Sequence, residues 1–298
     1  LLVLYVSAEN AMFDNKFGGA QIVEVVVLDP NRASTSESQG EPTVKVYEMK
    51  LRMAQAVDGN WYGYFADSTA LPAADSANNN LDFGTAVAIA RDGSGVATGD
   101  FSEASGVYNA TSADVISNAP TLTPAITGVL LGQIGLSAST WPVIQTYDFT
   151  IGTFDVVLEQ AGPDEVVSLD FDSGGMDDYA SLVLDRNSAS QESDIHLTIT
   201  DGQLNIDPTA KDVVIFYVGS GAEGVSFTNT TGGYDNADYK AYDNYFDDNG
   251  KLIINNNTSG SGVVLDNDPT LDDISADNFM VFFEGAENSG VFYNTDDD

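Results

Sequence analysis

Acidic residues gather in four stretches of this chain, and these are the residues whose types and spacing could do chemistry. In LDFDSGGMDD, two acids on alternate strand positions precede a glycine turn and two further acids. The second stretch surrounds NIDPT, and the others are YDNADYKAYDNYFDDNG and LDNDPTLDD. The candidate metal ligands are, in chain order, Asp170, Asp172, Asp177 and Asp178; Asp201, Asn205, Asp207 and Asp212; Asp235, Asn236, Asp238, Asp243, Asp247, Asp248 and Asn249; and Asp266, Asn267, Asp268, Asp272 and Asp273.

Carboxylate and amide oxygens are the ligands that hard divalent cations prefer. Ca²⁺ takes about six to eight oxygens, so a site needs several of these side chains together with carbonyls or water. We therefore predict that at least one stretch binds Ca²⁺, or Mg²⁺ in its place, and stiffens a turn or a domain junction. The alternative for each stretch is a solvated turn without an ion.

Residues for other chemistry are few. The chain has one histidine, His196 in DIHLTIT, and no cysteine. A Ser-His-Asp triad would have to use that histidine, and nucleophile-elbow, zinc-protease and phosphate-loop motifs are absent from the sequence. Among 46 acidic residues, a carboxylate pair carries no information about glycoside hydrolysis. We predict that the chain is not an enzyme.

The charge balance sets which partners the chain attracts. Its 46 acidic and 10 basic residues give a formal net charge of −36. Such a surface repels nucleic acids and anionic lipids and attracts cations, ammonium among them. The same charges repel one another, so salt or bound cations must screen them. No apolar stretch is long enough to cross a bilayer, and we expect no direct membrane insertion of this segment.

Short strands must position the acidic stretches. Runs such as QIVEVVVLD, TVKVYEM, NWYGYFAD, TFDVVLEQ, DIHLTIT and KDVVIFYV are rich in Val, Ile and aromatic residues and are bounded by turn residues. Helical periodicity is almost absent. This pattern predicts an all-β chain of tandem immunoglobulin-like antiparallel β-sandwich domains.

Two domains are expected from the chain length and from the positions of the loop and turn residues. We place the first at 1–158, with long Ala/Ser/Asn/Gly-rich loops inserted at about 71–140 that reach a neighbour rather than support a core. The second spans 159–298 and is truncated at its C-terminal end. A weak repeat supports this division. In each half an alternating strand runs into an Asp turn, at Asp29 and Asp201, and an acid-Pro-Thr follows, at 41–43 and 207–209.

The stretch VDGNWYGYFAD predicts a hairpin with a tight turn at Asp58-Gly59. Alternation along its second strand places Trp61 and Phe65 on one face and Tyr62 and Tyr64 on the other. One face should fill the core and the other should contact a neighbour. The candidate contact residues are Trp61, Tyr62 and Tyr64.

Four sequons are candidate glycosylation sites, at Asn109, Asn229, Asn256 and Asn257. An Asn/Ser/Thr-rich chain also produces a few such triplets by chance.

Four collinear segments resemble the surface-layer (S-layer) protein of ammonia-oxidising archaea: VDGNWYGYFAD, GQIGLSASTWPVIQTYDF, SLVLDRNSASQESDIHLTITDGQLNIDPTAKD and ENSGVFYNTDDD. They span nearly the whole chain. The resemblance implies a long secreted protein of tandem Ig-like domains, of which these residues are the N-terminal portion. It also implies a porous acidic lattice at the cell surface, metal-dependent assembly and glycosylation, and it identifies no individual metal ligand.

The expected function is therefore structural: a subunit that binds copies of itself in a protective lattice and gathers cations such as ammonium. A secreted calcium-dependent adhesin or carbohydrate-binding module is the first alternative. It would use the aromatic face as a stacking platform. A strand-exchanging pilus subunit is the second, and it would insert a lone strand such as 1–6 into the next subunit.

Overall fold

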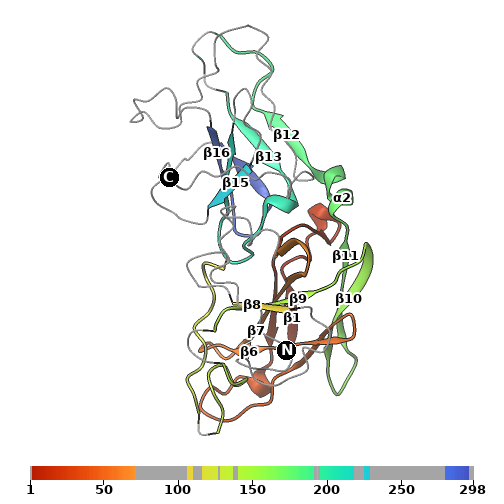
Figure 1. The fold of residues 1–298 in the computed structure, drawn as a ribbon, viewed down its shortest axis with the longest axis vertical. Helices are drawn as coiled ribbons and strands as arrows, with labels where there is room; N and C mark the ends of the chain where they lie inside the picture. Colours follow the sequence, from red (N-terminus) through yellow and green to blue (C-terminus); the bar gives the residue numbers. More distant parts are fainter. Residues whose placement is uncertain are drawn as a thin grey trace.

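The computed structural model describes residues 2–71, 106–109, 116–126, 128–136, 140–190, 193, 195–217, 225–228 and 279–294. Within these ranges the chain is mostly β-strand in three sheets, with one short α-helix and short 3-10 turns. The predicted all-β class is confirmed. Figure 1 shows two modules along the long axis of the molecule: one holds β1 and β6–β11, and the other holds β12–β17.

The first sheet has the order β1-β3-β7-β9-β8, with β6 paired to β7. Its strands are dominated by Val, Ile and aromatic residues, which suit a half-buried pleated surface. All pairs are antiparallel except β7 with β9, which run parallel. The bounds are β1 Val3–Val6, β3 Val23–Leu28, β6 Ala54–Gln55, β7 Trp61–Asp67, β8 Gly106–Asn109 and β9 Val143–Tyr147.

The second sheet has the order β2-β11-β10-β4-β5. Here the edge strand β2 runs parallel to β11, so the antiparallel expectation is wrong for one pair in each sheet of this module. In both cases the parallel partners are far apart in sequence, and alternation within a strand cannot reveal such a pairing. The bounds are β2 Lys16–Phe17, β4 Thr43–Val46, β5 Met49–Leu51, β10 Gly152–Glu159 and β11 Glu165–Phe171.

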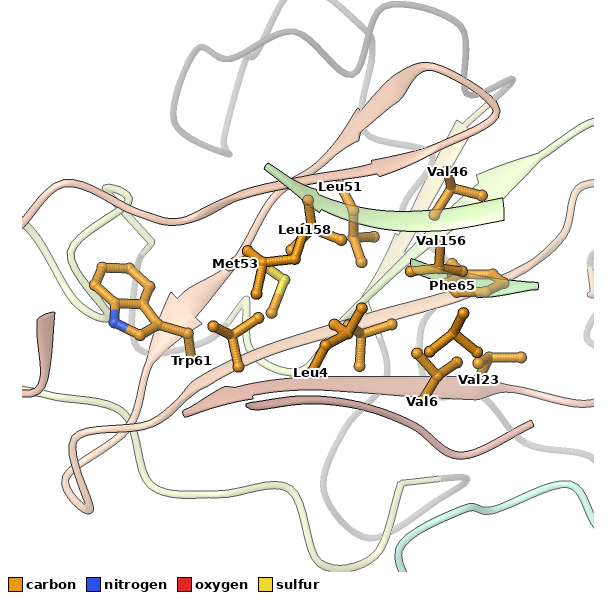
Figure 2. Close-up of a cluster of buried hydrophobic side chains, with 14 of the residues drawn as sticks. Leu4, Val6, Val23, Val46, Leu51, Met53, Trp61, Phe65, Val156 and Leu158 are labelled. Carbon is orange, nitrogen blue, oxygen red and sulfur yellow. The ribbon is translucent and has the colours of Figure 1, made fainter. Parts of the chain in front are cut away.

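A hydrophobic core fills the space between these two sheets. Figure 2 shows side chains of the first sheet, including Leu4, Val23 and Phe65, opposite Val156 and Leu158 of the second. Phe17 packs edge-on against Phe65, Phe149 and Phe154, with ring centroids 5.2–6.0 Å apart. The first module is therefore sandwich-like.

β11 lies beyond residue 158, where the sequence interpretation ends the first domain. It nevertheless pairs with β10 from Gly152↔Phe171 to Leu158↔Glu165. The segment between them is a hairpin turn, in which the Gln160 N–H donates to Asp164 Oδ1 at 3.2 Å. The Gly and Pro residues of this turn are typical of a linker, and the sequence was interpreted in that way. The pairing shows instead that the second sheet of the first module continues to Phe171.

The second module contains the third sheet, in the order β12-β13-β17-β16-β14-β15, with every pair antiparallel. The helix α2 (Ser173–Met176) and the 3-10 turn η3 (Asp177–Tyr179) connect β11 to it. The bounds are β12 Ser181–Leu184, β13 Leu197–Thr200, β14 Val213–Tyr217, β15 Val225–Thr228, β16 Phe279–Glu284 and β17 Val291–Tyr293. Three further 3-10 turns are η1 Ala11–Phe13, η2 Pro30–Arg32 and η4 Gly202–Leu204.

The hairpin predicted at Asp58-Gly59 joins β6 to β7. The Ala56 N–H donates to the Asn60 carbonyl at 2.9 Å, so the loop holds three residues, 57–59, rather than two. Gly59 has φ +89°, and a Cβ there would lie 2.7 Å from the Ala33 carbonyl oxygen. Only glycine satisfies both conditions without strain.

The described part of 71–140 supports the cores, contrary to the expectation for this region. β8 is a strand of the first sheet, and Leu122, Ile134 and Leu136 are buried in the first module's core. Ile116 belongs to a second hydrophobic cluster. No helix within the described residues is long and apolar enough to span a membrane.

That second cluster joins the two modules. The first module contributes Ile22, Tyr64, Ala66 and Ile144 among others, and the second contributes residues of η4, β13, β14, β16 and β17. Ile22, Tyr64, Ile144, Leu204, Val214, Phe282 and Phe292 are each almost completely buried. Because an apolar core rather than an open linker lies between them, the modules are packed against each other at this junction.

Candidate functional site at the junction of the two modules

The NIDPT turn lies at this junction, and its fold follows from its polar residues. β13 ends at Thr200, and Asp201 then caps η4 by accepting the Gln203 N–H at 2.9 Å. Asp29 has the same role in the first module, where it accepts the Asn31 N–H at 2.9 Å and caps η2. The weak repeat noted in the sequence therefore corresponds to a repeated local structure.

Asp207 and Thr209 of this turn hold a segment of the first module. The N–H of Ser117 donates to Asp207 Oδ2 at 2.8 Å, and the N–H of Asn118 donates to Thr209 Oγ1 at 3.1 Å. The Asn118 side-chain amide also donates to the Thr209 carbonyl at 2.7 Å. Asp207 is 1 % exposed. Together these contacts form a polar clasp between the modules.

Asp212 and Glu284 organise the backbone behind the clasp. Asp212 Oδ2 accepts the N–H groups of Ile206 and Asp207 at 2.6 and 3.0 Å. Glu284 accepts the N–H groups of Ser289 and Gly290 on Oε1 and that of Asp212 on Oε2. Buried backbone donors need such acceptors, so these acids fix the shape of the turn.

Two further hydrogen bonds cross the junction. The Ile22 N–H donates to the Ile206 carbonyl at 3.2 Å, and the Asn288 side-chain amide donates to the Ser7 carbonyl at 2.8 Å. Asn205 donates to Asn288 Oδ1 at 2.7 Å, while its own buried Oδ1 has no hydrogen-bond partner among the described residues.

Glu24 of β3 faces the same junction. Its neighbours Val23 and Val25 point into the first module's core, so alternation turns Glu24 to the opposite face of the sheet. There the Tyr64 hydroxyl donates to Glu24 Oε2 at 2.8 Å. A half-buried carboxyl thus lies where the second module packs.

The junction acids are costly to ionise. Burial raises the pKa of Glu24 to about 7, and the nearby charges of Asp207 and Glu287 add to this effect. Burial raises the pKa of Asp201 to about 6. Burial, with Glu284 and Asp207 close by, also holds the pKa of Asp212 well above its usual range. Desolvation penalises the charged form in each case.

Of the predicted ligands around NIDPT, Asp207 and Asp212 are neighbours, and the carboxylates of Asp201, Asp207 and Asp212 accept backbone N–H groups. Among the described residues, no group of three or more Asp, Glu or His side chains is arranged to hold a metal ion. Asp170, Asp172, Asp177 and Asp178, which all lie in the described part of the chain, do not form such a group either. Asp170 forms an ion pair with Lys16, Asp172 caps α2 through the Gly175 N–H, and Asp177 and Asp178 are exposed in η3.

Some predictions lie outside the described residues. These are the two acidic stretches with Asp235, Asn236, Asp238, Asp243, Asp247, Asp248 and Asn249 and with Asp266, Asn267, Asp268, Asp272 and Asp273, together with the sequons at Asn229, Asn256 and Asn257. Asn109 ends β8, the edge strand of the first sheet.

The aromatic contact surface is not formed as predicted. Trp61 and Tyr64 are both 0 % exposed: Trp61 packs in the first module's core and Tyr64 in the junction core. Tyr62 alone of the three is partly exposed, and its hydroxyl donates to Asp58 at 2.7 Å. The sequence correctly assigned Tyr64 to the face opposite Trp61, but it gave no sign that this chain's own second module covers that face.

Sequence reasoning missed Glu24 and Glu284 as junction residues. Each is an acid inside a strand of otherwise apolar character, in QIVEVVVLD and FMVFFEG. Such a residue is a signal of its own, because burying a charge is unfavourable unless the position has a specific partner. His196, by contrast, is exposed, and its backbone N–H donates to Asp185.

These contacts are those of a structural joint, with acids that accept backbone N–H groups and an apolar core beneath them. The chain matches no known protein-family model, and no curated protein is similar to it in sequence.

Proposed function

We propose that this chain is a structural subunit of an extracellular surface layer of the archaeal S-layer type. Copies of the chain assemble side by side, and rigid β-modules set the spacing of the resulting lattice. Its high negative charge gathers cations, including ammonium, close to the pore walls. At physiological ionic strength the field extends only about 8 Å, so enrichment is confined to the wall of a pore.

The observation that carries this proposal is the burial of β7 on both faces. Trp61 and Phe65 fill the first module's core, while Tyr64 and Ala66 fill the junction core. One aromatic strand is therefore shared between two cores, which favours a stiff two-module unit. The same burial removes the stacking platform on which a carbohydrate-binding function would depend.

The terminal strand β1 and the edge strand β12 indicate how copies of the chain could associate. β1 pairs with β3 of its own chain, so it is not a lone donor strand of the kind that a pilus subunit needs. β12 is an edge strand of the third sheet, and its Leu182, Val183 and Leu184 are 46–57 % exposed. No other described strand pairs with this side of β12, and an apolar sheet edge is an association surface that natural proteins usually protect. In the proposed lattice, β12 pairs with a second copy of the chain.

Cations enter the proposal as bridges between copies. With a net charge of −36, neighbouring copies repel one another unless counter-ions lie between them. We assign this role to Ca²⁺ or Mg²⁺ at exposed acids on the surface of each copy, because oxygen-rich surfaces favour these ions.

Electron microscopy of the purified, secreted protein tests the proposal. Ordered sheets should form with millimolar Ca²⁺ and dissolve with EDTA. Val183→Lys places a charge on the exposed β12 edge and should block sheet formation without changing the Tm. The matched control is Ile151→Lys, at a residue 78 % exposed outside any strand, which should leave assembly intact. Dispersed monomers at every Ca²⁺ concentration in sea salt would contradict the proposed function.

A further inference from the structure

Glu24 is placed where it can report on the contact between the modules. Its backbone is held in the first sheet: the Glu24 N–H donates to Ser7 Oγ at 2.8 Å, and its carbonyl accepts the Ser7 N–H at 2.9 Å. Ser7 in turn accepts Asn288 of the second module at its carbonyl. Two residues before Glu24, Ile22 donates to Ile206 of the second module. Glu24 is therefore bonded to Ser7 and lies two residues from Ile22, the two first-module residues that form these hydrogen bonds across the junction.

The groups facing Glu24 come from both modules. From the first module, Tyr64 donates to its carboxyl, and Tyr5 and Tyr62 lie within electrostatic range. From the second module, Asp207 and Glu287 face it. No basic side chain is among the described groups that act on it. The described ion pairs of lysine and arginine involve other acids: Asp29, Glu41, Glu48, Glu159, Asp170, Asp172 and Asp185.

We propose that Glu24 is a proton-operated latch: with a proton on its carboxyl the two modules pack closely, and loss of that proton loosens their junction. The protonated carboxyl accepts the Tyr64 hydroxyl and adds no charge beside Asp207 and Glu287. The carboxylate adds a third negative charge at a partly desolvated interface where no described basic group balances it. The repulsion is relieved when the second module moves away.

The direction of the pH dependence follows from linkage. In the folded protein the pKa of Glu24 is raised from 4.5 to about 7 by burial and by its acidic neighbours. Its contribution to stability is therefore complete below about pH 4.5 and is lost as the pH rises through about 7. The junction should be tight at pH 5.5 and looser at pH 8.5. This inference does not depend on the proposed surface-layer function.

Hydrogen exchange of the full chain at pH 5.5 and 8.5, corrected for the intrinsic exchange rate, tests the latch. Protection should fall several-fold at the Ile22 and Ser117 amides, which donate across the junction. It should stay constant at the Val156 amide, inside the first module's second sheet. Equal protection of Ile22 and Ser117 at both pH values would overturn the proposal.

Two variants separate the latch from a general effect of pH. Glu24→Gln keeps an acceptor for Tyr64 without a titrating proton, so its junction amides should show no pH-dependent loss of protection. Glu287→Gln changes an exposed residue and should still fold. Removing this neighbouring charge should move the wild-type midpoint to lower pH by a few tenths of a unit. If the midpoint does not move in Glu287→Gln, or if Glu24→Gln retains the full pH dependence, another group operates the junction.

Discussion

The acid-Pro-Thr turn occurs twice in this molecule, and the two copies stabilise their acid by different means. In the first, Glu41 Oε1 lies 2.6 Å from Lys50 Nζ and 2.8 Å from Arg52 Nε, and Oε2 accepts the Met53 N–H. In the second, Asp207 accepts the N–H groups of Ser117 and Thr209 and the Thr209 hydroxyl. No described ion pair includes it.

The difference shows how one local motif serves two purposes. The first turn lies within a single module and uses formal opposite charges to hold β5 against the preceding loop. The second turn lies between modules and uses backbone and hydroxyl donors, and no ion pair among the described residues involves its acids. A turn of the second kind responds to protonation, because its neighbouring acids, Asp212 and Glu24 among them, have pKa values raised by burial.

The largest loss of stability should come from removing the acid of the first turn, Glu41. Glu41→Ala removes the carboxylate that pairs with the Arg52 guanidinium, which is only 8 % exposed. Breaking a buried ion pair by removing one partner costs about 3–5 kcal/mol, and urea denaturation should show a loss of this size. The control is Glu48→Ala, whose exposed carboxylate lies 3.8 Å from Lys45 and should have no measurable effect. A loss below about 1 kcal/mol for Glu41→Ala would mean that water solvates Arg52.

The second turn should tolerate loss of a negative charge but not loss of an acceptor. Asp212→Ala leaves the Ile206 and Asp207 N–H groups without their partner, at a cost of about 2 kcal/mol. Asp212→Asn keeps an acceptor for these N–H groups and should retain most of the stability, because burial, with Glu284 close by, raises the pKa of Asp212 and so favours a neutral side chain. Thermal unfolding of both variants measures the difference. Equal damage from Asn and Ala would show that the ionised carboxylate is required.

The sequence predicted the strands and the local turns because both depend on neighbouring residues. Runs of Val, Ile, Leu and other apolar residues located β3, β10 and β13, and Asp58-Gly59 located the β6–β7 hairpin. The repeat of Asp29 and Asp201 identified two equivalent caps. In each case the physical cause acts within a few residues.

The sequence could not predict the junction, because the junction is built from contacts far apart in the chain. Ser117 and Asp207 are 90 residues apart, and Tyr64 is buried by strands that follow it by more than a hundred residues. Asp207 and Asp212, two of the acids around NIDPT, are neighbours in the structure. Their role depends on which donors surround them, and a count of carboxylates does not distinguish a cation site from a set of backbone acceptors.

The smallest effect on stability is expected from replacing the threonine of each acid-Pro-Thr turn. Thr209 donates its hydroxyl to Asp207 at 2.6 Å and accepts the Asn118 N–H at 3.1 Å, so it contributes to the clasp. Thr209→Val keeps the shape but removes both hydrogen bonds, which should lower the free energy of unfolding by about 1 kcal/mol. Thr43→Val, at the equivalent position, opens strand β4, where a β-branched residue suits the sheet and no loss is expected. Urea denaturation of the two variants at pH 6 gives the contrast directly. Equal losses would mean that both threonines act through the turn itself, and that the second turn has no special role in joining the modules.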